Sequence, residues 1–277
     1  MTGTVRATLA AATAALTGDE AGREAERLLQ HALGQPRAWL YAHADDAIDA
    51  SAERCVHELV ARRDAGEPLA YITGRREFWS LDLAVSPAVL IPRPETELLV
   101  ELAIQRIPHE QFASAADLGT GSGAIALAIA RERPRTQVLA TDSSAAALDV
   151  ARGNAARLAV ANVGFALGDW CAALGYAQFD LIVSNPPYIA AADPHLRRGD
   201  LRFEPTSALA SGIDGLDAIR SIVKAAPAHL RPGGWLLLEH GCEQGRDVRK
   251  LLETSGFVEV FTALDLEDRE RVSGGCR

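Results

Sequence analysis

Five short apolar stretches recur along the later part of the chain, and helical segments separate most of them. The apolar stretches lie near residues 115–118, 138–141, 163–166, 179–184 and 235–239. Each has the length of a buried strand. Apolar residues at helical spacing fill 124–133, 145–158, 216–229 and 245–255. Strands that alternate with helices predict an α/β fold with a mostly parallel, Rossmann-like sheet. Residues from 258 onward predict one or two further strands at an antiparallel edge.

The first 74 residues follow a different pattern, with apolar residues at helical spacing only. These residues form three groups: Val5, Leu9, Ala12 and Leu16; Ala25, Leu28, Leu29, Ala32 and Leu33; and Val56, Leu59 and Val60. They predict an N-terminal helical bundle domain, residues 1–74, which has no obvious catalytic group and is expected to bind or orient another molecule rather than react with it. Partial alternation between Glu77 and Val85 predicts a β-hairpin linker over residues 75–91. The α/β domain then covers residues 92–277.

The composition excludes several classes of protein. The formal net charge of −9 over 277 residues argues against a broad basic face, so no direct nucleic-acid binding is expected. The four cysteines are scattered without a C-x-x-C pair, so neither a disulfide framework nor a metal site is expected. No signal-peptide pattern occurs, and no apolar run approaches ~18 residues. A cytoplasmic protein without a membrane segment is therefore expected.

A glycine-rich loop follows the first predicted strand. It reads Asp117-Leu118-Gly119-Thr120-Gly121-Ser122-Gly123 and precedes an apolar helix. Glycines allow the backbone to approach a ligand closely and to adopt positive φ angles. Asp142 ends the second strand, where a carboxylate can accept hydrogen bonds from both hydroxyls of a ribose. Trp170 follows the third strand and offers a flat indole to an adenine ring. Together these residues predict a nucleoside-binding half of a site.

The loop by itself fits two cofactors. Gly119, Gly121 and Ala124 also match the dinucleotide pattern G-x-G-x-x-A, so a nicotinamide-dependent oxidoreductase is a rival interpretation. Asp142 alone also fits a helix-capping role, and Trp170 alone fits a core position. S-adenosylmethionine is favoured because the loop opens with Asp117 and because the motif after the fourth strand suits an amine rather than a hydride.

That motif is Asn185-Pro186-Pro187-Tyr188. The prolines end the strand that precedes them, because neither can donate to a sheet ladder and each fixes its own φ. Asn185 offers a side-chain carbonyl, Pro186 a main-chain carbonyl and Tyr188 an aromatic face. Two adjacent acceptors can each take one N–H of a planar NH₂ group. The motif therefore predicts a receptacle for an amide or an exocyclic amine.

These motifs resemble those of the bacterial peptide chain release factor N5-glutamine methyltransferases. The resemblance runs from the helical N-terminus nearly to the end of the chain. The segments that carry it are 77–80 (Glu-Phe-Trp-Ser), 91–97 (Ile-Pro-Arg-Pro-Glu-Thr-Glu), 117–124, 184–189, 202–205 (Arg-Phe-Glu-Pro) and 238–241 (Leu-Glu-His-Gly). The combination of Asn-Pro-Pro-Tyr with Ile-Pro-Arg-Pro-Glu-Thr-Glu is far more specific than either Asn-Pro-Pro-Tyr or the glycine loop.

The resemblance implies a seven-stranded methyltransferase sheet, with the N-terminal bundle binding the substrate. It implies S-adenosylmethionine as methyl donor and the glutamine of the Gly-Gly-Gln loop in class 1 release factors as acceptor, which tunes translation termination. The implied cofactor residues are Gly119, Thr120, Gly121, Ser122, Gly123, Asp142, Trp170 and Asn185. The implied substrate residues are Asn185, Pro186, Pro187, Tyr188 and Phe78, of which Asn185, Pro186 and Tyr188 are expected to take part in catalysis.

Three alternatives stay open at this point. A sister group methylates a glutamine of a ribosomal protein and usually has a different segment in place of residues 91–97. An N6-adenine or N2-guanine methyltransferase could use the same receptacle, although the acidic net charge argues against it. A non-enzymatic nucleoside-binding protein would keep the fold, but it would need neither Asn185 nor Pro186.

Overall fold

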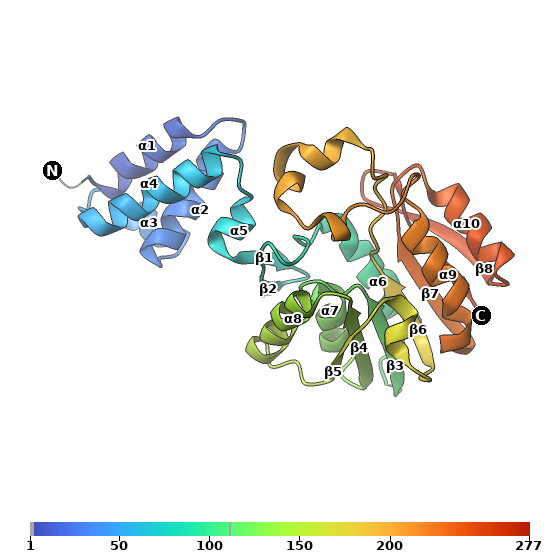
Figure 1. Ribbon diagram of the computed structural model, residues 1–277. Helices are drawn as coiled ribbons and strands as arrows, with labels where there is room; N and C mark the ends of the chain where they lie inside the picture. Colours follow the sequence, from blue (N-terminus) through green and yellow to red (C-terminus); the bar gives the residue numbers. More distant parts are fainter. Residues whose placement is uncertain (1–2, 111) are drawn as a thin grey trace. The chain divides into compact units, whose positions relative to one another are not determined.

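The computed structural model describes residues 3–110 and 112–277, and the chain divides into two compact units after Gly74. The first unit is helical (Figure 1). Its helices are α1 (Val5–Ala15), α2 (Ala21–Leu33), α3 (Arg37–Ala42), α4 (Ala50–Asp64) and α5 (Leu69–Thr73). Val5, Leu28 and Val56 come from three of these helices and are buried in one apolar core. The predicted helical bundle is therefore confirmed.

Two of these helices, α3 and α5, were not predicted. They have six and five residues, which is too short for a helical repeat of apolar residues to appear in the sequence. The longer α1 and α4 begin at side-chain caps, because Thr4 and Asp49 accept hydrogen bonds from main-chain N–H groups of the first turn.

The second unit begins with the hairpin formed by β1 (Arg75–Phe78) and β2 (Leu81–Ala84). Leu81 and Leu83 are fully buried in the same apolar cluster as residues of the central sheet. The hairpin is thus part of the second unit, Arg75–Arg277, and not a connection outside both units.

A seven-stranded sheet forms the centre of the second unit. Its strands are β3 (Ala113–Leu118), β4 (Thr136–Asp142), β5 (Val163–Leu167), β6 (Phe179–Ser184), β7 (Leu230–Glu239), β8 (Val258–Leu264) and β9 (Glu270–Cys276). The spatial order is β5-β4-β3-β6-β7-β9-β8, with β5 to β7 parallel and β9 antiparallel to both of its neighbours. The predicted α/β class is confirmed, and the C-terminal residues supply two strands.

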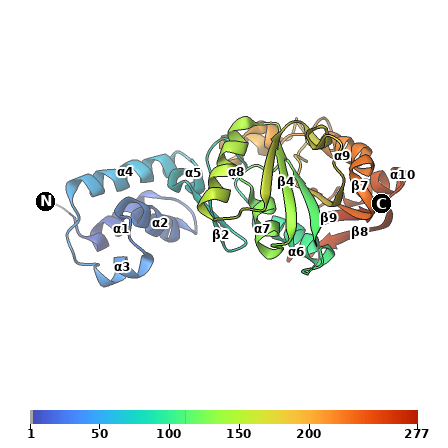
Figure 2. The ribbon, with the colours of Figure 1, turned by 90° about the horizontal axis from the view of Figure 1, so that it is seen from below.

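Alternating residues of the strands pack into two apolar clusters, one on each face of the sheet. Ala115, Leu181 and Leu237 point to the cluster that contains α6 (Glu97–Arg106), α7 (Ala124–Glu132) and part of α8 (Ala145–Arg157). Their neighbours Ala116, Ile182, Leu236 and Leu238 point to the cluster with α9 (Asp217–His229) and α10 (Gly245–Thr254). Figure 2 shows the strands between these two groups of helices. The sheet is therefore buried on both faces, as expected for parallel strands.

The strand order reverses beside β3, which has β4 on one side and β6 on the other. From β3 the chain continues through β4 to β5 at one edge of the sheet. It then returns to β6, on the other side of β3, and continues to β7 in the direction of the opposite edge. Such a switch point opens a crevice at the carboxyl ends of the strands. The glycine loop after β3 and the Asn-Pro-Pro-Tyr motif after β6 meet at this crevice.

Candidate active site

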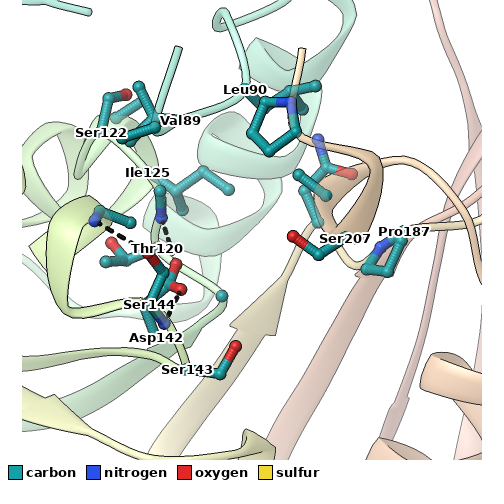
Figure 3. A pocket seen from close by; sticks show the side chains of 18 of the residues that line it. Val89, Leu90, Thr120, Ser122, Ile125, Asp142, Ser143, Ser144, Pro187 and Ser207 are labelled. Atoms are coloured by element: carbon teal, nitrogen blue, oxygen red, sulfur yellow. Dashed lines mark hydrogen bonds between the residues drawn. The ribbon is translucent and has the colours of Figure 1, made fainter. Parts of the chain in front are cut away.

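A cavity of about 300 Å³ lies beyond the carboxyl ends of β3, β4 and β6. Figure 3 shows Asp142, Ser143 and Ser144 on one side of this cavity and Pro187 and Ser207 across from them. The predicted site residues that line it are Gly119, Thr120, Gly121, Ser122, Asp142, Trp170, Asn185 and Pro187. Residues far apart in the sequence are thus brought to one cavity.

The glycine loop has the conformation that its sequence predicts. Gly119, Gly121 and Gly123 have φ angles of 74°, 55° and 84°, a region that favours glycine. A Cβ atom on Gly119 would lie 3.2 Å from the Trp170 ring, so this position is also closely packed. Gly123 does not line the cavity; it is the N-cap residue of α7. Within this loop, Gly119 and Gly121 are the glycines that line the cavity, where a ligand can approach their backbone.

Asp142 fixes the geometry of the cofactor side. Its Oδ2 accepts the N–H of Gly121 at 2.9 Å, and its Oδ1 accepts the N–H of Ser144 at 2.9 Å. Ser144 in turn caps α8 by accepting the N–H of Ala147 at 3.2 Å. Each carboxylate oxygen has a second lone pair that can accept from a ligand hydroxyl. The N-cap of α8 is thus Ser144 and not Asp142, which supports the cap residue and keeps lone pairs for a ligand.

Asp117 is a buried carboxyl under the same loop. Its Oδ2 accepts hydrogen bonds from the Thr120 hydroxyl at 2.6 Å and from the N–H of Ala126 at 3.2 Å. Burial raises the pKa of Asp117 to about 7, although the Thr120 and Ala126 hydrogen bonds oppose that shift. Asp117 thus fastens the loop to the start of α7.

On the other side of the cavity, Asn185 is held by a residue that the sequence analysis gave no role. Its Nδ2 donates to the hydroxyl of Thr96 at 3.1 Å. Thr96 is only 4% exposed and belongs to the Ile-Pro-Arg-Pro-Glu-Thr-Glu segment. Because the NH₂ group is engaged, the side-chain carbonyl of Asn185 is directed away from Thr96. This orientation supplies the acceptor that the motif predicts.

Pro186 and Tyr188 lie behind Asn185 and do not line the cavity. The Tyr188 hydroxyl donates to Oε1 of Glu239 at 3.3 Å, and the Tyr188 carbonyl accepts from the Gln244 side chain at 3.0 Å. Burial raises the pKa of Tyr188, and the nearby carboxylate of Glu239 adds to that shift. Tyr188 is therefore a neutral, fixed support for the motif.

The two segments that flank the cavity are joined by Glu204, another residue without a predicted role. Its Oε2 accepts the N–H of Ile91 at 3.0 Å, and its Oε1 is paired with Arg93. The Glu204 side chain is fully buried, whereas that of Arg93 is 30% exposed. Arg93 and Pro205 both line the cavity, so this pair fixes its wall.

The structure does not bring Phe78 to the cavity, which corrects the expectation that it contacts the substrate. Phe78 is 2% exposed and packs in the apolar cluster beneath the hairpin. It is the last residue of β1, and the alternation of that strand turns it toward the core.

Within the described residues, no group of three His, Cys, Asp or Glu side chains is arranged to hold a metal ion. No helix among residues 3–110 and 112–277 is long and apolar enough to cross a membrane.

Both parts of the chain match known protein families. Residues 7–74 match the family described as PrmC N-terminal domain, and residues 95–198 match the methyltransferase small domain. The fold is similar to a solved methyltransferase from Pyrococcus furiosus, with a TM-score of 0.54, 18% identity, and coverage of 78% of this chain and 96% of that chain. It is also similar to the 16S rRNA N2 G1207 methyltransferase of T. thermophilus, solved with AdoMet and guanosine, at a TM-score of 0.55 and 22% identity over 73% of this chain and 49% of that chain. Identities this low establish the fold alone.

Relatives in sequence are more similar. A release factor glutamine methyltransferase of Xylella fastidiosa (strain Temecula1) is 60% identical over 252 residues, which cover 91% of this chain and 92% of the relative. That of Escherichia coli (strain K12) is 47% identical over 253 residues, covering 91% of each chain. The resemblance seen in the motifs is therefore confirmed over nearly the whole length. The chain belongs to the release factor glutamine methyltransferase family.

Proposed function

We propose that this protein transfers a methyl group from S-adenosylmethionine to the side-chain amide nitrogen of the Gly-Gly-Gln glutamine in class 1 release factors. The observation that carries the proposal is the orientation of Asn185. With its NH₂ group donated to Thr96, the side chain presents a carbonyl oxygen at a cavity that also holds the glycine loop and Asp142. Family membership supports the glutamine of a release factor as the acceptor.

The cofactor side of the cavity fits S-adenosylmethionine. Substituting Gly119 would bring a side chain against Trp170, and Asp142 keeps lone pairs for ribose hydroxyls. Gly119, Thr120, Gly121, Ser122, Asp142 and Trp170 would hold the cofactor, with Asn185 between it and the acceptor. S-adenosylmethionine, when bound, supplies an electrophilic methyl group on a positively charged sulfur.

The chain's own residues then act on the acceptor amide. An amide nitrogen is a poor nucleophile because its lone pair is delocalised into the carbonyl. The Asn185 side-chain carbonyl, which lines the cavity, accepts one of its N–H groups and stabilises the positive charge that it acquires. The Pro186 main-chain carbonyl is proposed to accept the other N–H once the acceptor is bound, although Pro186 does not line the cavity here. Pro187 lies against the amide plane, and Tyr188 supports the motif. Preorganised dipoles and proximity supply most of the acceleration, and the proton leaves to water after transfer.

The N-terminal unit is proposed to recognise the release factor. It matches a domain family of its own, and none of its described residues, 3–74, is among those that line the cavity. Deleting residues 1–74 is expected to leave the affinity for S-adenosylhomocysteine unchanged while methylation of whole release factor is lost. Unchanged methylation by the shortened protein would contradict this role.

The proposed function is tested by transfer of labelled methyl groups to purified release factor. We expect incorporation into wild-type release factor and none into a variant whose Gly-Gly-Gln glutamine is replaced by alanine. We propose that the reaction takes place in the cytoplasm and needs no direct nucleic-acid binding. Label that appears instead in ribosomal protein or bulk nucleic acid would overturn the proposal.

A further inference from the structure

A buried carboxyl group lies behind the Asn-Pro-Pro-Tyr motif, and the mechanism above gives it no role. Glu239 is the last residue of β7 and is 1% exposed. In the parallel pairing of β6 with β7, Ser184 is opposite Leu238. Glu239 therefore ends β7 at the level of Asn185, the residue that follows β6. A charged side chain at such a position is costly to bury unless it makes hydrogen bonds.

Two hydroxyl groups connect Glu239 to the acceptor side of the cavity. The Tyr188 hydroxyl donates to its Oε1 at 3.3 Å. The Thr96 hydroxyl lies beside the same carboxyl group and lowers its pKa. Thr96 accepts a hydrogen bond from Asn185, so its own proton is free to point to Glu239. Oε2 of Glu239 is buried and has no hydrogen-bond partner within the described residues, so it is an acceptor that still lacks a donor.

A hydrogen bond from the Thr96 hydroxyl to this carboxylate would fix the orientation of the Asn185 amide. If the carboxylate takes the Thr96 proton, the Thr96 oxygen can only accept, and it must face the NH₂ group of Asn185. The carbonyl oxygen of Asn185 then points away from Thr96. Without the carboxylate, the Thr96 hydroxyl could donate to that carbonyl instead, and the amide could turn over.

We propose that Glu239 is a positioning residue that sets the Asn185 amide through Thr96 and holds Tyr188 directly. The inference rests on the proposed function, because it concerns the receptacle for the glutamine side chain. Glu239 does not touch the reacting atoms. Its ionised form accepts from both hydroxyls, whereas its protonated form must itself donate from one oxygen.

The charged and titratable groups around Glu239 come from three other segments. Glu95 belongs to the segment before α6, Tyr188 follows β6, and Arg271 belongs to β9. Arg271 is also paired with Asp265 at 3.1 Å. Burial raises the pKa of Glu239 to about 7, with Thr96, Arg271 and Tyr188 opposing the shift and Glu95 adding to it. The ionised fraction of Glu239 therefore changes near neutral pH.

The experiment uses the full chain, S-adenosylmethionine and purified release factor, and measures single-turnover methylation. Thr96→Val removes the hydroxyl at nearly constant volume, and Thr96→Ser is the matched control that keeps it. We expect Thr96→Ser to stay within about threefold of the wild type. Thr96→Val and Glu239→Gln should each lower the rate about 10- to 150-fold, the range expected for a lost hydrogen bond to a charged group. KM for release factor and the affinity for S-adenosylhomocysteine should change little.

Two further readouts separate positioning from a purely structural role. The wild-type rate should rise with pH through about 7, and Glu239→Gln should lose that dependence. In an Asn185→Ala background, Glu239→Gln should cost much less than it does alone, because the group that it orients is gone. Fully additive losses, or a Thr96→Val variant as active as Thr96→Ser, would overturn the inference.

A failure of this inference is distinct from a failure of the proposed function. If the wild-type protein does not methylate release factor, the proposed function itself is wrong. If the wild type is active and the hydroxyl and carboxyl variants match it, only the role of Glu239 is wrong. Should Glu239→Gln not fold, the Thr96 pair and its pH profile still decide the question.

Discussion

The two sides of the cavity are built in different ways. On the cofactor side, Asp142 binds the N–H of Gly121, 21 residues away, and the N–H of Ser144, two residues away. On the acceptor side, Asn185 is bound to Thr96 over 89 residues, and Ile91 to Glu204 over 113 residues. The cofactor side is fixed by neighbouring strand ends, whereas the acceptor side depends on segments from across the unit. Changes far from the chemistry should therefore affect the acceptor more than the cofactor.

The strongest test of this difference is Asn185→Ala. It removes the carbonyl that accepts from the amide as charge develops on nitrogen. By analogy with the loss of a preorganised oxyanion-hole donor, the single-turnover rate should fall about 10²–10³-fold, or ~2.7–4 kcal/mol. Cofactor affinity should change far less, because Asp142 and the glycine loop keep their hydrogen bonds. Near-native turnover by this variant would contradict the receptacle.

Asn185→Asp sharpens the same test. The aspartate keeps an acceptor but loses the NH₂ group that donates to Thr96. It also puts a second carboxylate next to the Thr96 hydroxyl, so under the proposed role of Glu239 the two acceptors would compete for one proton. We expect Asn185→Asp to be about as slow as Asn185→Ala in single-turnover assays. An aspartate variant much faster than the alanine variant would mean that the bond to Thr96 is unimportant.

The same difference explains what the sequence could predict. The glycine loop, Asp142 and the end of β6 are local patterns, and the structure brings most of their residues to one cavity, except Gly123, Pro186 and Tyr188. Thr96, Glu204 and Glu239 belong to segments that carry the family resemblance, but the sequence predicts no role for them. Their roles come from contacts with distant segments. Strand β7 begins at Leu230, whereas the sequence predicts a start near residue 235. The predicted start is late because Pro232-Gly233-Gly234 is a sequence typical of a turn.

On the cofactor side, the matching prediction is Asp142→Ala. The variant loses acceptors for the ribose and for the N–H groups of Gly121 and Ser144. Hydrogen bonds to a charged group contribute about 1.5–3 kcal/mol, or a 10- to 150-fold change in dissociation constant. Calorimetric titration with S-adenosylhomocysteine measures it. The rate at saturating cofactor should change little, and unchanged affinity would contradict the role of Asp142.

A smaller effect is expected from Arg93→Ala, which unpairs Glu204 at the cavity wall. Because the Arg93 side chain is 30% exposed, water screens the pair and the loss should be about 1–2 kcal/mol. This corresponds to a rise of about 5- to 30-fold in KM for release factor. Arg152→Ala, which removes an exposed pair with Asp149 on α8, is the matched control and should be silent. Equal effects of the two variants would show that Glu204 does not fix the wall.

A last comparison separates the two sides by pH. Each side holds one carboxyl group with a pKa of about 7, Asp117 under the glycine loop and Glu239 behind Asn185. In the unfolded chain such groups titrate near 4. Between about pH 4 and pH 7 the folded protein therefore binds more protons, and its stability falls as pH rises. The slope is at most about 1.4 kcal/mol per pH unit for each group.

Asp117→Asn and Glu239→Gln should each reduce the change in unfolding free energy with pH by the contribution of one carboxyl group. Denaturation curves recorded between pH 5 and pH 7 measure this change. The pKa of the buried His240 is lowered by burial, so its contribution has the opposite sign in this range. The measurement is therefore the difference between each variant and the wild type. Only Glu239→Gln should also remove the pH dependence of methyl transfer, because Asp117 supports the loop and does not orient Asn185. A loss of that dependence in Asp117→Asn alone would place the titrating group on the cofactor side.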